Sequence, residues 1–491
     1  MVRLTRFTIS ALVLAVLAAA PPAAAQTDFL TDFLMSEDKE RQIAEQEHPK
    51  ILAQFGGAYQ DADLQRYVES IVNYLGRTSQ RPDIRYRITI LNSPVVNAFA
   101  LPAGYLYITR GLLALAGNEA ELAGVLAHEI GHVTARHTAR RFSRAMLAQG
   151  VVGLLGAATQ NTEMAGLTQM VEVGAVLALQ SFSREHEHES DALAIPNMAR
   201  AGYDPRAMAS FLAKLQSQSD LMATLAGQQG AGNQFNLFST HPRTVERVQR
   251  TVRAAVVTDV RDPMVERELY LGKINGILFD DDPEQGFVRG RLFAHPGLNF
   301  RFEVPEGFQL LNGQTQVIAQ NKDGAAIRFD MATEPSPGSV ERYLTETWLK
   351  NQPVQALQNI DVNGFPAATA ATRLAKDGQE ADLRFVAIQA SRDRIYRFLF
   401  VTPPNLTKPL SKAFRETTYS FRPIPQNERQ QLRPRRLALY RTKPGDTVAS
   451  LARYMPYSDH TQERFRVLNG LLPGQRLAAG QLVKLVTEAD R

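Results

Sequence analysis

Apolar residues along the first part of the chain recur first at helical spacing and then in alternation with polar residues. Residues 37–76 carry them at helical spacing, and residues 84–90 then alternate between polar and apolar side chains, as a half-buried strand does. A second extended stretch, residues 97–109, contains Pro102 and Gly104, which predict a turn between two strands. We therefore expect helices, a strand and a hairpin, and the proline favours an edge position for that hairpin.

A further helix is predicted directly after this hairpin. Asn118 and Glu121 have the spacing of a capping box, and Leu122, Val125 and Leu126 follow at helical intervals. The pattern therefore predicts a helix, and the motif described below lies about three turns into it.

The second half of the chain has a different pattern. Four stretches alternate as strands do and two have helical spacing, which predicts a small α+β domain over residues 286–422. The predicted strands are 299–304, 326–329, 383–388 and 395–401, and the predicted helices are 340–350 and 410–417. This domain contains no combination of acids and histidines that indicates catalysis, so we expect a binding or packing role.

Two segments have the composition of linkers. Residues 266–285 contain an Asp-Asp-Asp-Pro run, and residues 423–437 are rich in Pro, Gln and Arg. The second segment carries a basic cluster, Arg433, Arg435 and Arg436. We interpret this cluster as promoting solubility, the alternative being contact with an anionic surface.

Composition narrows the class of protein. A chain of 491 residues is too long for one ordinary core and predicts two or three domains. A net charge of +5 is too small at this length to indicate a nucleic-acid partner, and the absence of cysteine excludes a disulfide framework and a lipid-modified cysteine. Residues 145–158 and 171–179 are apolar but too short to span a bilayer. They should pack in the core, the alternative being a hairpin that makes peripheral contact with a membrane.

The N-terminal residues have the form of an export signal. Arg3 and Arg6 precede an apolar run at 11–17, and the alanines at 23–25 supply an A-x-A site with cleavage expected before Gln26. The run is shorter than the roughly 20 residues of a spanning helix, which disfavours a membrane anchor. We therefore expect an exported protein, periplasmic in a cell with two membranes.

The clearest chemical motif is His128-Glu129-Ile130-Gly131-His132. Helical residues four apart differ by about 40° around the axis, so His128 and His132 point the same way and can bind one metal ion. Glu129 lies about 100° round from His128, where its carboxylate can act as a base toward water rather than as a ligand. Six of the nine histidines lie between residues 128 and 241, which disfavours a merely solvated pair.

Two histidines leave a catalytic zinc site one protein ligand short. Glu187 and Asp191 are four residues apart, so Glu187 can serve as the ligand while Asp191 orients a ligating imidazole from behind. His186, His188 and Glu189 remain open as alternatives.

Two other histidines have weaker assignments. His137 is nine residues after His128, about 180° around an unbroken helix, and is expected on its opposite side in a packing or hydrogen-bonding role. His241 precedes Pro242, which by itself indicates the start of another helix, with Arg247 six residues beyond.

The predicted hairpin is the candidate binding site for a peptide. An edge strand over a metal can receive a substrate backbone by β-addition, and the alternative is an ordinary core hairpin. The candidate substrate-binding residues are Asn97, Ala98, Phe99, Ala100 and Leu101.

These motifs resemble a family of secreted and membrane zinc metallopeptidases that includes HtpX, the CAAX prenyl proteases and the periplasmic BepA-type proteases, and the BepA-like branch is the most similar. The matching features occur in one order over roughly residues 37–255. They are the 97–104 stretch, residues 118–122, the HExxH helix with His137, Ser183-Arg184 with Glu187 and Asp191, and Thr240-His241-Pro242 with Arg247.

The resemblance implies a mainly α zincin-like metallopeptidase domain with a small β-sheet, over residues 26–265. It implies one zinc ion held by His128, His132 and Glu187, with Glu129 as base and Asp191 behind the ligands.

The resemblance also bears on His241 and Arg247. In similar proteins, the histidine that matches His241 can lie over the metal as an extra ligand that blocks it, so His241 is a candidate fourth ligand. The arginine that matches Arg247 in similar proteins is a candidate for stabilising the transition state. Ser190 replaces the alanine usual before the aspartate, and the tetratricopeptide repeats usual in BepA-type proteins do not appear in this chain.

The last segment, residues 438–488, resembles a LysM module, a β-α-α-β glycan binder. It carries Gly445-Asp446-Thr447 and Leu468-Asn469-Gly470 as landmarks, with an irregular stretch between them. The resemblance implies contact with peptidoglycan, and the alternative is a degenerate structural module.

Together these features predict an exported zinc endopeptidase that cleaves unfolded or misassembled envelope proteins, in quality control linked to outer-membrane assembly. One rival is a wall-bound chaperone or assembly factor whose metal site is structural or blocked by His241. A second rival is a peptidoglycan hydrolase, which release of muropeptides from purified wall would distinguish from a protease.

Overall fold

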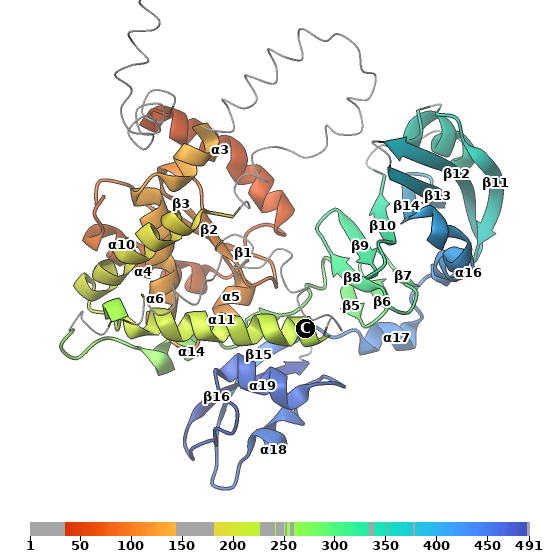
Figure 1. The fold of residues 1–491 in the computed structure, drawn as a ribbon. Helices are drawn as coiled ribbons and strands as arrows, with labels where there is room; N and C mark the ends of the chain where they lie inside the picture. Colours follow the sequence, from red (N-terminus) through yellow and green to blue (C-terminus); the bar gives the residue numbers. More distant parts are fainter. Residues whose placement is uncertain are drawn as a thin grey trace, which may run out of the picture.

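The computed structural model describes residues 35–143, 181–225, 241, 250, 253–255, 260–332, 338–350, 352–376 and 379–488. The predicted export signal at 1–25, the apolar stretches at 145–158 and 171–179, and Arg247 lie outside the described residues. The rest forms a helical body, a β-rich domain beside it and a small C-terminal unit beneath it (Figure 1). Among the described helices, none combines the length and apolar character needed to cross a membrane.

The helical body is built mainly from the first half of the chain. Its helices are α3 (Glu37–Gln54), α4 (Ala62–Thr78), α5 (Arg110–Leu115), α6 (Glu119–Thr134), α10 (Arg184–Arg200) and α11 (Arg206–Leu225). The predicted start of α6 is confirmed, because the Asn118 side chain accepts a hydrogen bond from the Glu121 N–H at 2.8 Å. Residues 119–133 of α6 are all buried, so this helix runs through the core with neighbours on every face.

A small sheet lies next to α6. Its strands are β1 (Arg87–Leu91), β2 (Ala98–Ala100) and β3 (Tyr105–Thr109) in the order β1-β3-β2, so β2 is an edge strand. The predicted hairpin is confirmed, since β2 and β3 pair antiparallel. Gly104 has a φ of 81°, and a Cβ there would lie 2.7 Å from Ile84 Cγ2, so the turn requires glycine.

The β-rich domain is larger in strand content than its sequence pattern predicts. A seven-stranded antiparallel sheet has the order β11-β12-β13-β14-β10-β9-β8, and a smaller sheet has the order β5-β6-β7. The strands are β5 (Phe287–Arg289), β6 (Leu292–His295), β7 (Phe300–Glu303), β8 (Gln309–Asn312), β9 (Gln316–Gln320), β10 (Ala326–Met331), β11 (Gln355–Val362), β12 (Phe365–Lys376), β13 (Gln379–Ser391) and β14 (Arg394–Thr402). Helix α16 (Pro404–Ser420) and the short α15 (Val340–Arg342), which continues as a π-helical turn, complete the domain.

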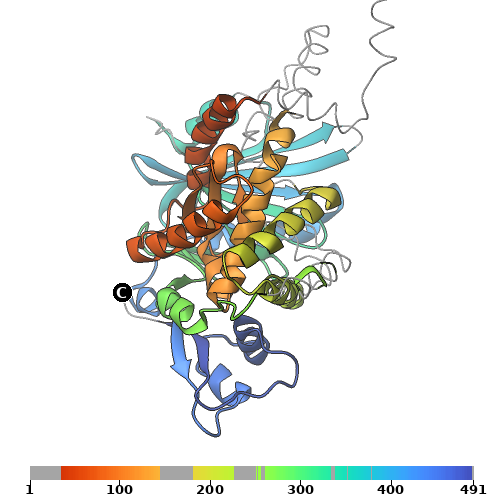
Figure 2. The same cartoon turned by 90° about the vertical axis from the view of Figure 1, so that its left-hand side faces the viewer.

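The C-terminal unit has the predicted β-α-α-β order. It consists of β15 (Arg435–Arg441), α18 (Val448–Ala452), α19 (Thr461–Asn469) and β16 (Leu482–Glu488), and the two strands pair antiparallel. It is not a separate module in packing terms. Leu437, Phe465 and Val483 belong to the same hydrophobic core as Leu113 and Leu122 of the helical body, and the unit lies directly against that body in both views (Figure 2).

Both predicted linkers are corrected by the structure. Residues 266–285 contain α14 (Arg267–Ile274), which buries Tyr270 in the core, and β4 (Leu278–Phe279), which pairs with β15. Residues 423–437 contain α17 (Gln426–Gln431) and the start of β15. The composition of these segments reflects their solvent-facing residues. It carries no information about pairing with a strand about 150 residues away.

The basic cluster also has a structural role. Arg435 donates hydrogen bonds to Asp280 Oδ2 at 3.0 Å and to the Pro456 carbonyl at 2.7 Å, and Arg436 donates to the Gly276 carbonyl at 2.8 Å. These two arginines therefore attach the C-terminal unit to the segment that was predicted to be a linker.

A buried lysine joins the C-terminal unit to the helical body. Lys484 of β16 is fully buried, and its Nζ donates to the carbonyls of Ala114, Leu115 and Ala116 at 2.7, 3.0 and 2.9 Å. Burial lowers the pKa of Lys484 well below its usual value, while three acceptors match the three N–H bonds of an ammonium group. The lysine thus satisfies carbonyls at the end of α5 that would otherwise lack partners.

We expect Lys484→Met to destabilise the protein by about 1–3 kcal/mol, because the carbonyls at the end of α5 stay buried after their donor is removed. Urea unfolding followed by circular dichroism measures the change. Lys443→Met, on an exposed lysine of the same unit, should unfold at the parent's midpoint. An unchanged midpoint for Lys484→Met would show that this contact contributes nothing to stability.

Candidate metal centre

Helix α6 presents three polar side chains on one buried face. His128, Glu129 and His132 are 5%, 1% and 0% exposed. Burial lowers the pKa of His132 well below its usual value, so this imidazole is neutral and can offer a lone pair.

Helix α10 brings the complementary carboxylates. Ser183 caps its N-terminus by accepting a hydrogen bond from the His186 N–H, and the helix places Glu187 and Asp191 one turn apart in the core. Gly131 allows α10 to approach α6, because a Cβ at this position would lie 2.9 Å from the Ser190 carbonyl oxygen. Ser190, the unusual residue before the aspartate, donates from its Oγ to the His128 carbonyl at 3.1 Å.

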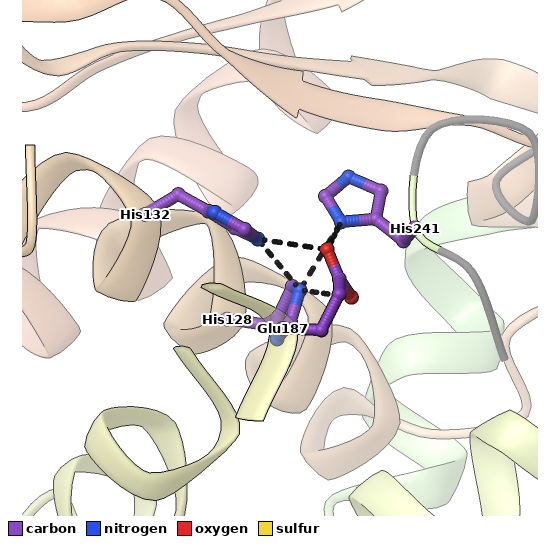
Figure 3. Close-up of side chains that lie close together, drawn as sticks. All are labelled: His128, His132, Glu187 and His241. Atoms are coloured by element: carbon purple, nitrogen blue, oxygen red, sulfur yellow. Dashed lines mark hydrogen bonds and ion pairs between the residues drawn. The ribbon is translucent and has the colours of Figure 1, made fainter. Parts of the chain in front are cut away.

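Four side chains converge at one point (Figure 3). The Nε2 atoms of His128 and His132 are 3.0 Å apart, and Glu187 oxygens lie 3.5 Å and 3.4 Å from them. His241 completes the group, with its Nδ1 3.2 Å from His128 Nε2 and 2.9 Å from Glu187 Oε1. The structure thus brings together the two motif histidines, Glu187 and His241, while His186 and His188 do not belong to the group.

These separations fit a zinc ion. Tetrahedral coordination at about 2.0–2.1 Å keeps ligand atoms roughly 3.3 Å apart. The five separations given above run from 2.9 to 3.5 Å, and all four ligand atoms lie within 4.8 Å of one another. Three imidazoles and one carboxylate are also typical zinc ligands. A cation bound among these four side chains would accept their lone pairs, which otherwise repel one another. The donor set therefore suits zinc chemically as well as geometrically.

Glu129 lies beside these four side chains. Its Oε1 is 3.4 Å from His241 Nε2, yet neither carboxylate oxygen accepts a hydrogen bond within the described part of the chain. Burying a carboxylate without hydrogen bonds costs free energy, and such groups in folded proteins often mark a functional site.

The two helical histidines are oriented from behind in different ways. Asp191 Oδ1 lies 2.9 Å from His128 Nδ1. His132 Nδ1 instead lies 3.0 Å from His137 Nδ1, and His137 Nε2 lies 3.0 Å from Glu189 Oε2. Burial lowers the pKa of His137 to about 4, so this ring is also neutral near pH 7.

The predicted position of His137, opposite the metal, is therefore wrong. Helix α6 ends at Thr134, and Arg136 has a φ of 54°, so the chain reverses and returns His137 to the back of His132. The prediction assumed an unbroken helix, and the hydrogen-bonding role that it allowed is the one observed.

Two further side chains beside the centre were missed by sequence reasoning. The Phe182 ring stacks on His132 with centroids 3.9 Å apart, and the Arg141 guanidinium carbon lies 3.5 Å from the Phe182 centroid. Two groups this close cannot share one face of the ring, so Phe182 separates Arg141 from His132. Burial lowers the pKa of Arg141 to about 10, an effect that Glu187 and Glu129 oppose by charge attraction. No local motif marks these residues.

The candidate substrate strand lies at the edge of the sheet but is covered by its surroundings. Asn97 to Leu101 are each at most 3% exposed, and the Ala100 carbonyl accepts a hydrogen bond from Thr138 Oγ1 at 3.2 Å. An incoming peptide would have to displace part of this cover to pair with β2.

The sequence of this chain is similar to those of known metallopeptidases. Residues 59–255 match the model of Peptidase family M48. The beta-barrel assembly-enhancing protease of Yersinia pestis is 37% identical over 32% of this chain and 34% of its own length. Its namesake from Escherichia coli K12 is 30% identical over 59% and 62%, and the mitochondrial metalloendopeptidase OMA1 of Schizosaccharomyces pombe is 27% identical over 44% and 61%.

The match is thus centred on the residues that build the metal centre. The chain spans less than two thirds of the length of each of these three relatives. Both HExxH histidines, Glu187 and His241 fall inside the matched range. The chain contains a metallopeptidase domain of peptidase family M48, at residues 59–255.

Proposed function

We propose that the protein is an exported zinc endopeptidase that hydrolyses peptide bonds of unfolded or misassembled envelope proteins. The observation that carries this proposal is the convergence of four buried ligand atoms with a carboxylate, Glu129, beside them. Such a combination suits metal-assisted hydrolysis rather than a purely structural site, which needs no adjacent base.

Each residue has a proposed role. His128, His132 and Glu187 would hold zinc, and Asp191 would orient His128 by accepting its Nδ1–H. When bound, zinc supplies a Lewis acid that polarises the scissile carbonyl and makes water more acidic. Glu129 would remove a proton from the attacking water and pass it to the leaving nitrogen.

Two further roles rest on the resemblance. Arg247 would steady negative charge that develops on the carbonyl oxygen. Residues 97–101 would receive the substrate backbone by β-addition, after displacement of the contacts that cover β2.

His241 would keep the enzyme closed until a substrate or partner displaces it. With His241 as a fourth ligand, the site would offer four protein ligands, the number typical of a closed zinc site, and would leave none for water. Its Nε2 lies 3.4 Å from Glu129 Oε1 but makes no hydrogen bond to any described residue, which supports easier displacement of His241 than of His128 or His132. The convergence of four protein ligand atoms equally suits the rival function, an assembly factor whose site stays blocked.

The proposed location and partners of this protein are based on its relatives. Two relatives are named for the assembly of β-barrels, so we place this protein in the periplasm, where it would act during outer-membrane assembly. Residues 438–488 would contact peptidoglycan while fixed to the peptidase domain through their shared core.

Glu129→Gln should keep its zinc and lose about 10²–10⁴-fold of the parent's rate of casein cleavage, because the amide cannot take up a proton. Atomic emission measures bound zinc, and fluorescent casein measures cleavage. A chelator should abolish cleavage by the parent, and added zinc should restore it. Glu185→Gln, on an exposed glutamate of α10, should behave as the parent; a Glu129→Gln protein that cuts at the parent's rate would refute the assigned base.

His241→Ala should cleave casein faster than the parent, on the order of tenfold if the closed state is favoured by roughly 1.4 kcal/mol. The matched control is His460→Ala, which removes an exposed imidazole far along the chain. Activation supports a gated protease. If parent and His241→Ala both bind zinc and both fail to cut casein, the blocked assembly factor becomes the better description.

A further inference from the structure

The hydrogen bonds behind His132 have no role in the function proposed above. His132, His137 and Glu189 form a chain whose successive contacts are both 3.0 Å, and it begins in the fully buried core and ends at a half-exposed carboxylate. His128 has a shorter arrangement, a direct contact with Asp191.

The chemistry of the groups sets the direction of every hydrogen bond in the longer chain. An ionised carboxylate can only accept, so Glu189 requires a proton on His137 Nε2. A neutral imidazole carries one proton, so His137 Nδ1 must accept, and His132 Nδ1 must donate to it. His132 Nε2 is then left with a lone pair, and this is the atom that faces His128 and Glu187.

The surroundings of His137 hold this arrangement in place. Its ring is fully buried and stacks on His186 with centroids 4.2 Å apart and an interplanar angle of 24°. Phe182 stacks on the face of the His132 ring with centroids 3.9 Å apart and restricts rotation of that ring. Both rings therefore have little freedom to adopt another orientation or to exchange nitrogen positions.

We propose that His137 and Glu189 are positioning residues that present the lone pair of His132 Nε2 to the metal through a histidine–histidine–carboxylate chain. This inference rests on the proposed function, because it assumes that His132 is a zinc ligand. The chain plays for His132 the part that Asp191 plays for His128, and a partner of this kind fixes the tautomer and raises the basicity of the ligand. It differs from the Asp191 contact in reaching the surface, so its far end can be altered without disturbing the core.

The test measures zinc affinity of the full-length protein by competition with a chelating indicator, alongside the visible absorption spectrum of the cobalt-substituted protein. His137→Phe keeps the ring and its stacking but removes both hydrogen bonds. We expect zinc affinity to fall about 10–100-fold and the cobalt bands to shift. His137→Gln, whose amide offers both an acceptor and a donor, should retain more affinity than His137→Phe.

Glu189 provides a test that does not depend on folding of the core. Its side chain is 51% exposed, so Glu189→Ala should leave the fold intact and weaken zinc binding in the same direction but by less than His137→Phe. Glu185→Ala makes the same change at an exposed site of the same helix and should match the parent.

The outcomes separate this inference from the proposed function. A parent that binds zinc and cuts casein, together with variants of His137 and Glu189 that keep its affinity and cobalt spectrum, would overturn the inference alone. A parent that binds no zinc would overturn the proposed function and the inference with it. Loss of thermal stability in His137→Phe without any change in affinity or spectrum would assign His137 to packing and would also overturn the inference.

Discussion

The close approach of α10 to α6 determines whether a metal centre can form. At their contact, residue 131 has no side chain, and the Ser190 backbone and hydroxyl occupy the space that a Cβ would need. The Ser190 hydroxyl reinforces the contact by donating to the His128 carbonyl. Only at this separation can Glu187 lie within 3.5 Å of both histidines and Asp191 within hydrogen-bonding distance of His128. A larger residue at 131 would push the carboxylates away from the imidazoles.

A dense group of buried polar atoms is stable only if its members satisfy one another. Here His128 and His132 are each oriented from behind by hydrogen bonds that end on a carboxylate. His241 differs from both, because its second nitrogen lies 3.4 Å from Glu129 Oε1 without a hydrogen bond to any described residue. The group therefore combines two imidazoles that are oriented by hydrogen bonds from behind with a third that is held differently.

The helix that carries the motif is also held at its other end. Near the start of α6, Glu121 accepts from Lys214 Nζ at 2.6 Å and from the Gly117 N–H at 2.7 Å. Lys484 of the C-terminal unit donates to the carbonyls that precede this helix. The unit thus forms part of the scaffold of the metal centre, whatever it contacts on its outer surface, and the β-rich domain has a core of its own.

Local periodicity was sufficient to predict α6, the hairpin before it, and the spacing that puts His128 with His132 and Glu187 with Asp191 on shared helix faces, because each depends on neighbours within a few positions. The β-α-α-β order at the C-terminus and the place of His241 beside the other three side chains were implied only by resemblance to known families. Tertiary structure decided the rest. The reversal at Arg136 that places His137 behind His132, the Phe182 ring between His132 and Arg141, and the folding of residues 266–285 into the core all depend on residues far apart in sequence. Helical spacing reports which side chains share a face, whereas the partner that meets that face is chosen by packing, which leaves no local pattern.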